Sequence, residues 1–322
     1  MSSDTNEALY PLVAVVGPTA SGKSTLALDI AERFSGEIVN FDSVQVYRGF
    51  EIGTAKTPLV ERRGIPHHLL DIVAPDAVFT AGHYAERARV VVDEIRERSR
   101  LPVFVGGTGL YLRALLNGLF QGPKRDEALR ERLEQRVESK PVGYLHRVLK
   151  RLDPASAERI HPNDTPKLMR SIEVRLLARA PISALWNEGT DPLEGYEVAR
   201  VGLNPNRSAL YARINRRTKQ MFKTGLIEET QALLTSGPPR SARPFGSLGY
   251  KQALDYLDGG ITLEDAIESA AKTTRRYAKR QMTWFRREPD VHWLPGFGDE
   301  DAVCTEALAY VKGRVRPLTG ST

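Results

Sequence analysis

Apolar and polar positions alternate at two different spacings along the first third of the chain. Short, mostly apolar runs at 12–16, 38–42 and 101–105 are separated by longer amphipathic stretches at 23–34 and 80–99. The short runs predict buried strands and the longer stretches predict helices. Strands that alternate with helices are typical of a parallel sheet with helices on both faces, so we expect an α/β core.

The pattern changes between about residues 124 and 199, where the sequence is helical, dense in charge and interrupted by prolines. Asp164 or Thr165 can cap a helix that has Pro166 in its first turn and runs to about Ala178. A strand is expected again at 201–203, followed by helices at 206–224, 227–234, 250–257 and 262–285. The sequence thus predicts a core made of residues 1–123 and 200–322 around a helical insertion domain at 124–199.

A complete phosphate-binding motif lies between the first predicted strand and the helix after it. Residues 17–24 fit the pattern G-x-x-x-x-G-K-[ST], with strand and helix on the correct sides. The glycines let successive N–H groups point at phosphate oxygens, while the start of the helix adds its positive dipole end. The motif predicts a P-loop NTPase-like core whose phosphate-binding residues are Gly17, Pro18, Thr19, Ala20, Ser21, Gly22, Lys23 and Ser24.

Two side chains of this loop have expected roles. Lys23 would neutralise the distal phosphate, and Ser24 would offer its hydroxyl to a magnesium ion shared with the phosphates. Ligands in parallel sheets lie beyond the carboxyl ends of the strands. Asp42 and Thr108, which follow the next two apolar runs, should therefore join the loop in one cleft. The motif itself does not identify the phosphorylated molecule.

Composition limits the class of protein. Cys304 is the only cysteine among 322 residues, which excludes an internal disulfide and a cysteine-rich zinc module and fits a reducing cytoplasm. The first eight residues are polar, unlike a signal peptide, and no apolar run has the length that spans a bilayer. We expect a soluble cytoplasmic protein without membrane contact, with a monomer as the simplest oligomeric state.

The net charge of +6 is concentrated in the last third, where residues 200–322 carry 20 Lys/Arg against 13 Asp/Glu. Such an imbalance indicates either a polyanionic partner or a solvated basic face. Residues 272–287 hold seven basic residues and no acidic one, whereas a merely solvated helix usually includes carboxylates in i,i+4 pairs. This stretch predicts contacts with nucleic-acid phosphates, with Tyr277, Trp284 and Phe285 expected in the core rather than stacked on bases.

The sequence leaves three interpretations of Asp42 open. It can be a magnesium ligand, a cap of a helix or turn, or a general base that prepares an acceptor group, and spacing does not separate these roles.

Two further groups of residues also have alternative interpretations. His67 and His68 with Asp71 suggest either a metal site or ordinary loop packing, and packing is favoured because adjacent side chains point apart. Arg213 and Arg217 lie four apart on a predicted helix, where they would form either a clamp over a diphosphate or a solvated basic face.

Eight ordered segments resemble the tRNA dimethylallyltransferases, also called tRNA isopentenyltransferases. They are GPTASGKS at 17–24, DSVQVYRG at 42–49, IGTAK at 52–56, HHLLDI at 67–72, VGGTGLY at 105–111, HPND at 161–164, LGYKQ at 248–252 and YAKRQMTWFR at 277–286. The resemblance extends over about residues 11–294. It implies transfer of a dimethylallyl group from dimethylallyl diphosphate to N6 of the adenosine 3′-adjacent to the anticodon of tRNAs, with magnesium as cofactor.

The resemblance also implies roles for individual residues. Asp42 would be the general base, Lys23 and Arg213 would stabilise the departing diphosphate together with magnesium, Arg217 is a further diphosphate-binding candidate, and Thr108 would lie at the reaction-centre channel. The residues that would contact the tRNA anticodon stem-loop are Asp42, Ser43, Val44, Gln45, Thr108, Arg130, Pro166, Lys167, Leu168, Met169, Arg170, Gly246, Ser247, Leu248, Gly249, Tyr250 and Lys251.

Two features depart from the family pattern. Gly246 and Ser247 precede LGYK where many relatives carry a longer polar side chain, which puts one base contact in doubt. The chain also ends without the zinc-finger extension of eukaryotic relatives, as expected for the short bacterial form.

Two enzymatic alternatives share the phosphate-binding loop. A P-loop small-molecule kinase is disfavoured because the run at 101–105 leads into Gly-Gly-Thr rather than a second magnesium carboxylate. A prenyltransferase acting on free adenine nucleotides does not explain the basic stretch at 272–287. An RNA-binding switch protein would need phosphate hydrolysis or exchange, for which the sequence gives no sign.

Overall fold

The computed structural model of the chain describes residues 9–120, 122–138, 140–185 and 190–315. Two compact units are formed, a core made of Met1–Leu116 and Leu193–Thr322 and an insertion made of Asn117–Pro192. Residues 117–123 thus belong to the insertion and 193–199 to the core, which corrects the expected boundaries, because strand β5 already begins at Tyr196. The chain leaves the core at Leu116 and returns at Leu193, whose amide donates a 3.2 Å hydrogen bond to the Leu116 carbonyl.

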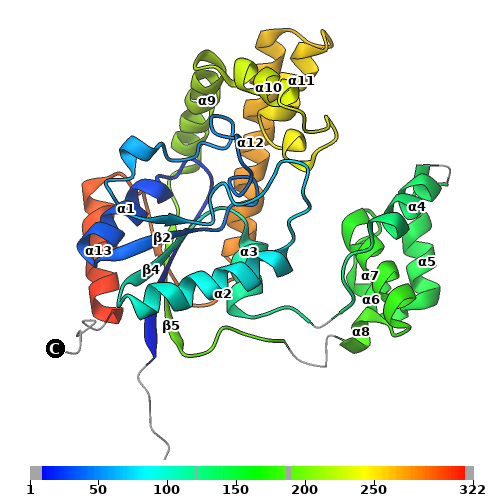
Figure 1. Ribbon diagram of the computed structural model, residues 1–322, viewed down its shortest axis with the longest axis horizontal. Coiled ribbons are helices and arrows are strands. Elements are labelled where there is room, and N and C mark those ends of the chain that lie inside the picture. Colours follow the sequence, from blue (N-terminus) through cyan, green and yellow to red (C-terminus); the bar gives the residue numbers. More distant parts are fainter. Residues whose placement is uncertain (1–8, 121, 139, 186–189, 316–322) are drawn as a thin grey trace, which may run out of the picture. The chain divides into compact units, whose positions relative to one another are not determined.

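The core contains a six-stranded sheet in which all strand pairs are parallel (Figure 1). Its order is β3-β2-β4-β1-β5-β6. The inner strand β1 is buried on both faces, which explains why its sequence is a continuous apolar run. The strands are β1 (Tyr10–Val16), β2 (Gly36–Asn40), β3 (His67–His68), β4 (Leu101–Val105), β5 (Tyr196–Leu203) and β6 (Val291–Leu294).

Helices cover both faces of this sheet. Val13 and Val15 of β1 pack in a cluster with α1 (Lys23–Arg33) and α13 (Asp301–Arg314), while Leu12, Ala14 and Val16 belong to the cluster of the opposite face. That second cluster includes side chains of α2 (Ala81–Glu97) and α3 (Gly109–Leu116). The other core helices are α9 (Arg207–Lys223), α10 (Leu226–Thr235), α11 (Tyr250–Leu257) and α12 (Leu263–Phe285), close to the predicted bounds.

Several short or late elements were not expected from the sequence. His67 and His68 were predicted to lie in a loop, but they form the edge strand β3, because Ile38 and Val39 of β2 pair with them. Strand β6, helix α13 and the 3-10 turns η1 (Leu59–Glu61) and η2 (Arg243–Gly246) were also missed. Over the described ranges, no helix is both long and apolar enough to cross a membrane.

The insertion consists of α4 (Glu127–Glu138), α5 (Tyr144–Leu152), α6 (Pro154–Arg159), α7 (Thr165–Ala178) and α8 (Ile182–Leu185). Asp164 caps α7, since its carboxylate accepts the amide of Lys167, and Pro166 occupies the first turn as predicted. Leu168 and Met169 of α7 are buried with residues of α5 in the main apolar cluster.

A buried carboxylate holds the insertion together on the polar side of α7. Glu173 is fully buried, and its oxygens accept hydrogen bonds from the Arg130 side chain at 3.0 Å, the Arg170 side chain at 2.6 Å and the Asp126 amide at 2.9 Å. The two guanidinium groups outweigh the effect of burial and lower the pKa of Glu173 to about 2. Arg130 and Arg170, both expected to contact RNA, are therefore engaged within the insertion.

The insertion should lose stability in acid because of Glu173. Its folded-state pKa lies below the ordinary value of 4.5, so the ionised form contributes stability above pH 4.5 that is lost as the pH falls toward about 2. The shift corresponds to about 3 kcal/mol. Hydrogen exchange of α7 amides in the full chain, corrected for intrinsic rates, should accelerate over this range.

In Glu173→Gln the α7 amides should already exchange rapidly near neutral pH, because the substitution leaves two arginines beside a neutral group. Glu131→Gln, an exposed glutamate of α4, is the matched control and should exchange like the unmodified chain. Equal protection of α7 in Glu173→Gln and the unmodified chain would contradict this role.

Candidate functional site

A polar pocket of about 460 Å³ lies in the core at the carboxyl ends of the strands. Its walls come from the loop after β1, the segment after β2, the loop after β4, and helices α9 and α12. The phosphate-binding loop and Asp42 both line it, which confirms that these segments converge. Thr108 itself does not appear in the lining, but its neighbours Gly106 and Gly107 do.

The loop after β1 is shaped by two glycines with left-handed backbones. Gly17 has φ 140°, and a Cβ on it would lie 2.9 Å from the Leu203 carbonyl oxygen. Gly22 has φ 85° and precedes α1, and a Cβ there would lie 2.8 Å from the Gly298 amide nitrogen. Both positions therefore require glycine. The loop also contains the fully buried Ser21, whose hydroxyl has no hydrogen-bond partner in the part of the chain that the structure describes.

Positive charge is concentrated beside this loop. The Lys23 ammonium folds back onto the Pro18 carbonyl at 2.6 Å, and the Arg217 guanidinium donates to the Thr19 hydroxyl at 2.5 Å. Burial, and then repulsion from Arg217, lowers the pKa of Lys23 to about 7, although Asp42 opposes the shift. Burial, and then Arg213, lowers the pKa of Arg217 to about 10. Cations destabilised in this way are suited to an anionic ligand.

The two arginines of α9, for which the sequence left a clamp and a solvated face open, both line the pocket, but they differ in their contacts. Arg213 forms two hydrogen bonds of 2.7 Å with the Asp299 carboxylate, and its guanidinium lies 4.8 Å from the centre of the Phe297 ring. Arg217 contacts the phosphate-binding loop directly. In this structure Arg217 is thus the closer match to the expected clamp, while Arg213 ties α9 to the segment after β6.

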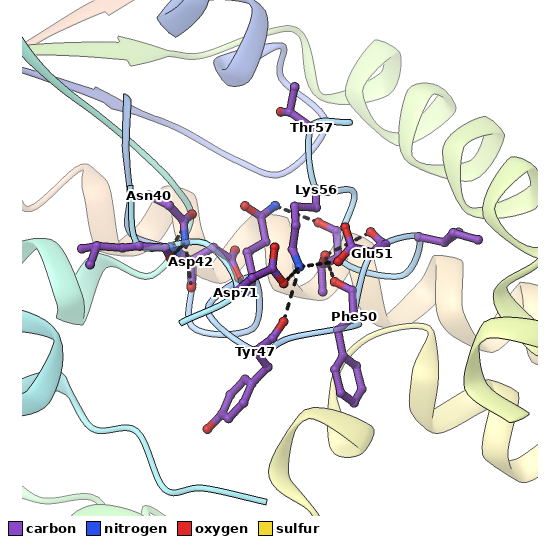
Figure 2. A network of polar contacts seen from close by, with 12 residues as sticks. Asn40, Asp42, Tyr47, Phe50, Glu51, Lys56, Thr57 and Asp71 are labelled. Carbon is purple, nitrogen blue, oxygen red and sulfur yellow. Dashed lines mark hydrogen bonds and ion pairs between the residues drawn. The ribbon is translucent and has the colours of Figure 1, made fainter. Parts of the chain in front are cut away.

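Asp42 uses its two carboxylate oxygens differently. Oδ1 accepts the amides of Val44 at 2.9 Å and Gln45 at 3.3 Å, so it caps the turn after β2. Oδ2 lies 3.5 Å from the position that a Cβ on Gly107 would take, on the side where both residues line the pocket. Figure 2 shows Asp42 beside Asn40, whose side chain accepts the Asp42 amide at 3.0 Å. Capping therefore leaves one oxygen for chemistry.

Thr108 connects the loop after β4 to the segment after β2. Its hydroxyl accepts the Ser43 amide at 3.0 Å and donates to the Ser43 hydroxyl at 3.1 Å, and its own amide donates to the Phe41 carbonyl at 3.2 Å. Thr108 consequently fixes the backbone on which Asp42 is carried.

Two residues of α12 were not expected at the pocket, since the sequence did not single out Gln281 and predicted Tyr277 in the core, yet both line it. The Gln281 side chain accepts the Thr19 amide at 2.7 Å and donates to the Gly107 carbonyl at 3.0 Å, and the Tyr277 hydroxyl donates to the same carbonyl at 3.3 Å. Gln281 is buried, on the same side of α12 as Ala278 and Phe285. A glutamine on an otherwise apolar helix face was the signal that could have identified it.

Several expected RNA contacts need correction, because their side chains are committed elsewhere. Leu168 and Met169 are buried in the insertion. Tyr250 is fully buried against Phe50, and its hydroxyl donates to the Glu229 carboxylate. Gly249 is buried as well. The other expected residues are at least partly exposed, including Ser43, Val44, Gln45, Pro166, Lys167, Gly246, Ser247, Leu248 and Lys251.

Helix α12 also carries an exposed basic stripe, formed by Lys272, Arg276 and Lys279. Their spacing of four and three places them on one helical face, away from the buried Ala278 and Gln281. The stretch 272–287 thus separates into a cationic outer face and an inner face that reaches the pocket, with Phe285 in the core as predicted.

The described segments contain no group of three His, Cys, Asp or Glu side chains that could hold a metal ion. His68 contacts the buried Glu37 at 2.7 Å, and His67 contacts the Ile65 carbonyl at 2.8 Å, as packing requires. A magnesium ion bound mainly through a diphosphate needs few protein ligands. Ser24, exposed in the first turn of α1 and lining the pocket, offers a hydroxyl suited to such an ion.

Comparison with known proteins points to one family. The IPP transferase family model matches residues 45–288. The chain is 56% identical over 301 residues to the tRNA dimethylallyltransferase of Koribacter versatilis (strain Ellin345), covering 94% of this chain and 98% of that protein. It is 55% identical over 298 residues to the tRNA dimethylallyltransferase of Solibacter usitatus (strain Ellin6076), covering 92% and 97%.

Solved structures give the same result. The full-length tRNA isopentenylpyrophosphate transferase of Bacillus halodurans superposes with a TM-score of 0.70 at 41% identity, covering 95% of this chain and 96% of that one. A eukaryotic dimethylallyltransferase acting on tRNA superposes with a TM-score of 0.76 at 28% identity, covering 89% of this chain and 74% of that one.

Ligand binding at the pocket should change the protonation of Lys23. With a pKa of about 7, Lys23 is mostly neutral at about pH 8, and a bound anion favours the ammonium form. Methyl diphosphate, whose last ionisation is near pH 6, should therefore take up close to one proton when it binds at about pH 8 and fewer as the pH falls below about 7. Calorimetry in buffers of different ionisation enthalpy measures this uptake.

Lys23→Arg is the matched variant, because it keeps the positive charge and does not titrate in this range. It should bind methyl diphosphate without proton uptake. The same uptake in both proteins would place the titrating group elsewhere.

Proposed function

The chain belongs to the IPP transferase family, and from this premise we infer that it is a tRNA dimethylallyltransferase. It transfers the dimethylallyl group of dimethylallyl diphosphate to N6 of the adenosine 3′-adjacent to the anticodon of tRNAs and releases diphosphate. The observation that carries this function is the near full-length identity to such enzymes, joined to a cationic pocket that is lined by both Asp42 and the phosphate-binding loop.

The diphosphate of the donor is proposed to bind the loop at residues 17–24. Lys23 and Arg217 supply positive charge there, and the buried Ser21 hydroxyl lacks a partner within the described residues. Ser24 would hold magnesium, which neutralises charge on the diphosphate oxygens. A prenyl diphosphate needs no pocket for a nucleotide base, so ATP is not required for transfer.

Asp42 is proposed to be the general base. Adenine N6 is a weak nucleophile because its lone pair is delocalised into the ring, so proton removal during attack is useful. As N6 bonds to the allylic carbon, the carbon–oxygen bond to diphosphate breaks, the bonding electrons leave with diphosphate, and the N6 proton passes to Oδ2 of Asp42. Oδ1 stays bound to the amides of Val44 and Gln45, which keeps the carboxylate in one orientation.

Charge that accumulates on the leaving diphosphate is stabilised by the cations already at the loop. Lys23 becomes fully protonated beside the anion. Arg217 lies near the proposed diphosphate site, because its guanidinium donates to the hydroxyl of Thr19 in the phosphate-binding loop. Arg213 contributes when it exchanges Asp299 for the diphosphate, or acts indirectly by closing the segment after β6 onto the loop.

The tRNA is proposed to contact both units. The basic stripe of α12 offers three exposed cations, and Lys167 at the start of α7 is 70% exposed on its side chain. The target adenosine must leave the anticodon-loop stack to reach Asp42, an extrusion that costs a few kcal/mol and is offset by such contacts. We therefore also propose that the enzyme works in the cytoplasm, where it would meet its tRNA substrate.

The decisive experiment is a transfer assay without nucleoside triphosphate. The protein, magnesium and labelled dimethylallyl diphosphate should label unmodified tRNA and leave free adenosine monophosphate unlabelled. Obligatory ATP turnover would favour a kinase, and labelling of adenosine monophosphate alone would favour a prenyltransferase for free nucleotides.

Asp42→Asn keeps the shape of the side chain and loses its basicity. It should slow single-turnover transfer by about 10²–10⁴-fold, the usual range for loss of a positioned base, while tRNA affinity stays within a few-fold. A near-normal single-turnover rate would leave Asp42 only its capping role.

Loss of the basic stripe should weaken tRNA binding and its salt dependence. Replacing Lys272, Arg276 and Lys279 with Ala should flatten the slope of log affinity against log salt by about 0.7–0.9 for each phosphate contact removed. Binding of dimethylallyl diphosphate should not change. Lys312→Ala with Arg314→Ala, two exposed cations of α13, is the matched control and should leave the slope unaltered.

The insertion is tested by Lys167→Ala alone. Arg170 is unsuitable, because its replacement also removes a partner of the buried Glu173.

An unchanged salt slope in the α12 variant would show that this stripe is a solvated face.

A further inference from the structure

A buried ammonium group joins loop segments of the core that the proposed chemistry does not use. The side chain of Lys56 is 0% exposed, and its Nζ lies 2.5 Å from Asp71 Oδ1, 2.8 Å from Glu51 Oε1 and 3.3 Å from the Tyr47 carbonyl oxygen. Figure 2 shows these groups converging on Lys56 from separate stretches of loop. Its three N–H donors therefore have three acceptors.

This arrangement excludes Lys56 as a partner of the diphosphate. Glu51 and Asp71 bring two negative charges to one ammonium, so the cluster carries no positive charge that an anion would recognise. Lys56 does line the pocket wall, together with Thr54, Ala55 and Thr57. Lys56 must therefore contribute to the reaction by holding these loop segments in position.

The loops joined by Lys56 contain unfavourable backbone conformations. Ala55 has φ 53°, Leu69 has φ 61° and Asp71 has φ 55°, in the left-handed region that residues with a side chain avoid because Cβ approaches the carbonyl oxygen. Such conformations persist only where surrounding contacts impose them, and they concentrate at functional sites. The ion pair of Lys56 with Asp71 is a contact of this kind, because it fixes one of these residues by its side chain.

A short path of hydrogen bonds leads from Lys56 to the carboxylate of Asp42. The Asp71 amide donates to the Gln45 carbonyl at 3.2 Å, and the Gln45 amide donates to Asp42 Oδ1 at 3.3 Å. The Gln45 side chain in turn donates to the Thr54 carbonyl at 3.0 Å. The segments on both sides of Lys56 thus close onto Gln45, one of the two residues whose amides orient the proposed base.

We propose that Lys56 is a positioning residue for the transfer reaction, which fixes the orientation of the Asp42 carboxylate through Asp71 and Gln45. The inference rests on the proposed role of Asp42 as general base. In this assignment Lys56 acts through Asp42 and not on either substrate. Without it, the two carboxylates repel each other, the left-handed residues Leu69 and Asp71 relax, and the Gln45 amide no longer holds Oδ1 in place.

A double-variant cycle measured by single-turnover transfer tests the proposal. Lys56→Met should slow transfer by about 10–100-fold, the effect of a small misplacement of a reacting group, with the affinities for dimethylallyl diphosphate and tRNA within about threefold. Because Lys56 acts through Asp42, the variant that combines Lys56→Met with Asp42→Asn should be no slower than Asp42→Asn alone.

The matched control is Glu37→Gln, which weakens another buried ion cluster of the core, formed with Arg98 and His68 at the start of β2. It should lower the melting temperature and leave the transfer rate of the folded protein normal. A normal rate in Lys56→Met, or multiplicative losses in the combined variant, would overturn the proposal while the role of Asp42 stands. A normal rate in Asp42→Asn would instead contradict the role of Asp42 as general base, on which the proposed mechanism and the proposal for Lys56 both depend.

Chemical rescue separates positioning from folding. Lys56→Ala lacks the three methylenes and the ammonium that n-propylammonium supplies, and the pocket that Lys56 lines gives access to the space left behind. Added n-propylammonium should raise the transfer rate of Lys56→Ala at least about tenfold. Added n-propanol, which carries no charge, should leave that rate unchanged. Equal responses to both compounds would overturn the assignment of the ammonium charge as the active feature.

Discussion

The parallel pairing of β1 with β4 and β5 is the constraint on which the site depends. Because Val15 pairs with Val105 and Asn40 with the same residue from the other side, the carboxyl ends of β1, β2 and β4 stop at one level and release their loops into one pocket. On the far side of β1, Val16 pairs with Gly202, which brings Leu203 against Gly17. A slip of one residue would turn every strand side chain to the opposite face.

Helix α12 gives the second half of the site its rigidity. Gln281 and Tyr277 on its inner face reach the loops after β1 and β4, and the cationic stripe lies on its outer face. One helix therefore contacts both the place proposed for the small donor and the place proposed for the large acceptor. Any displacement of α12 by RNA would change the position of the Thr19 amide, because this amide donates a hydrogen bond to Gln281.

The sequence predicted what is encoded locally. Periodicity located β1, α1, α9 and α12, and the glycine spacing located the phosphate-binding loop. Contacts between distant residues were out of reach, because no local pattern shows that Glu173 binds Arg130, 43 residues earlier, or that two histidines add an edge strand to β2. Asp42 shows why its role stayed open, since capping and base chemistry use different oxygens of one carboxylate.

The hydrogen bond between Leu193 and Leu116 has a consequence for how this enzyme could have been assembled. The insertion begins and ends at one point of the core, so for the core it is a single closed loop. The entropic cost of closing a loop rises only slowly with the number of residues in it. The sheet and pocket can thus keep their structure while the intervening residues are exchanged. The insertion is in this respect a module that can vary in length and sequence while the chemistry of the pocket is kept.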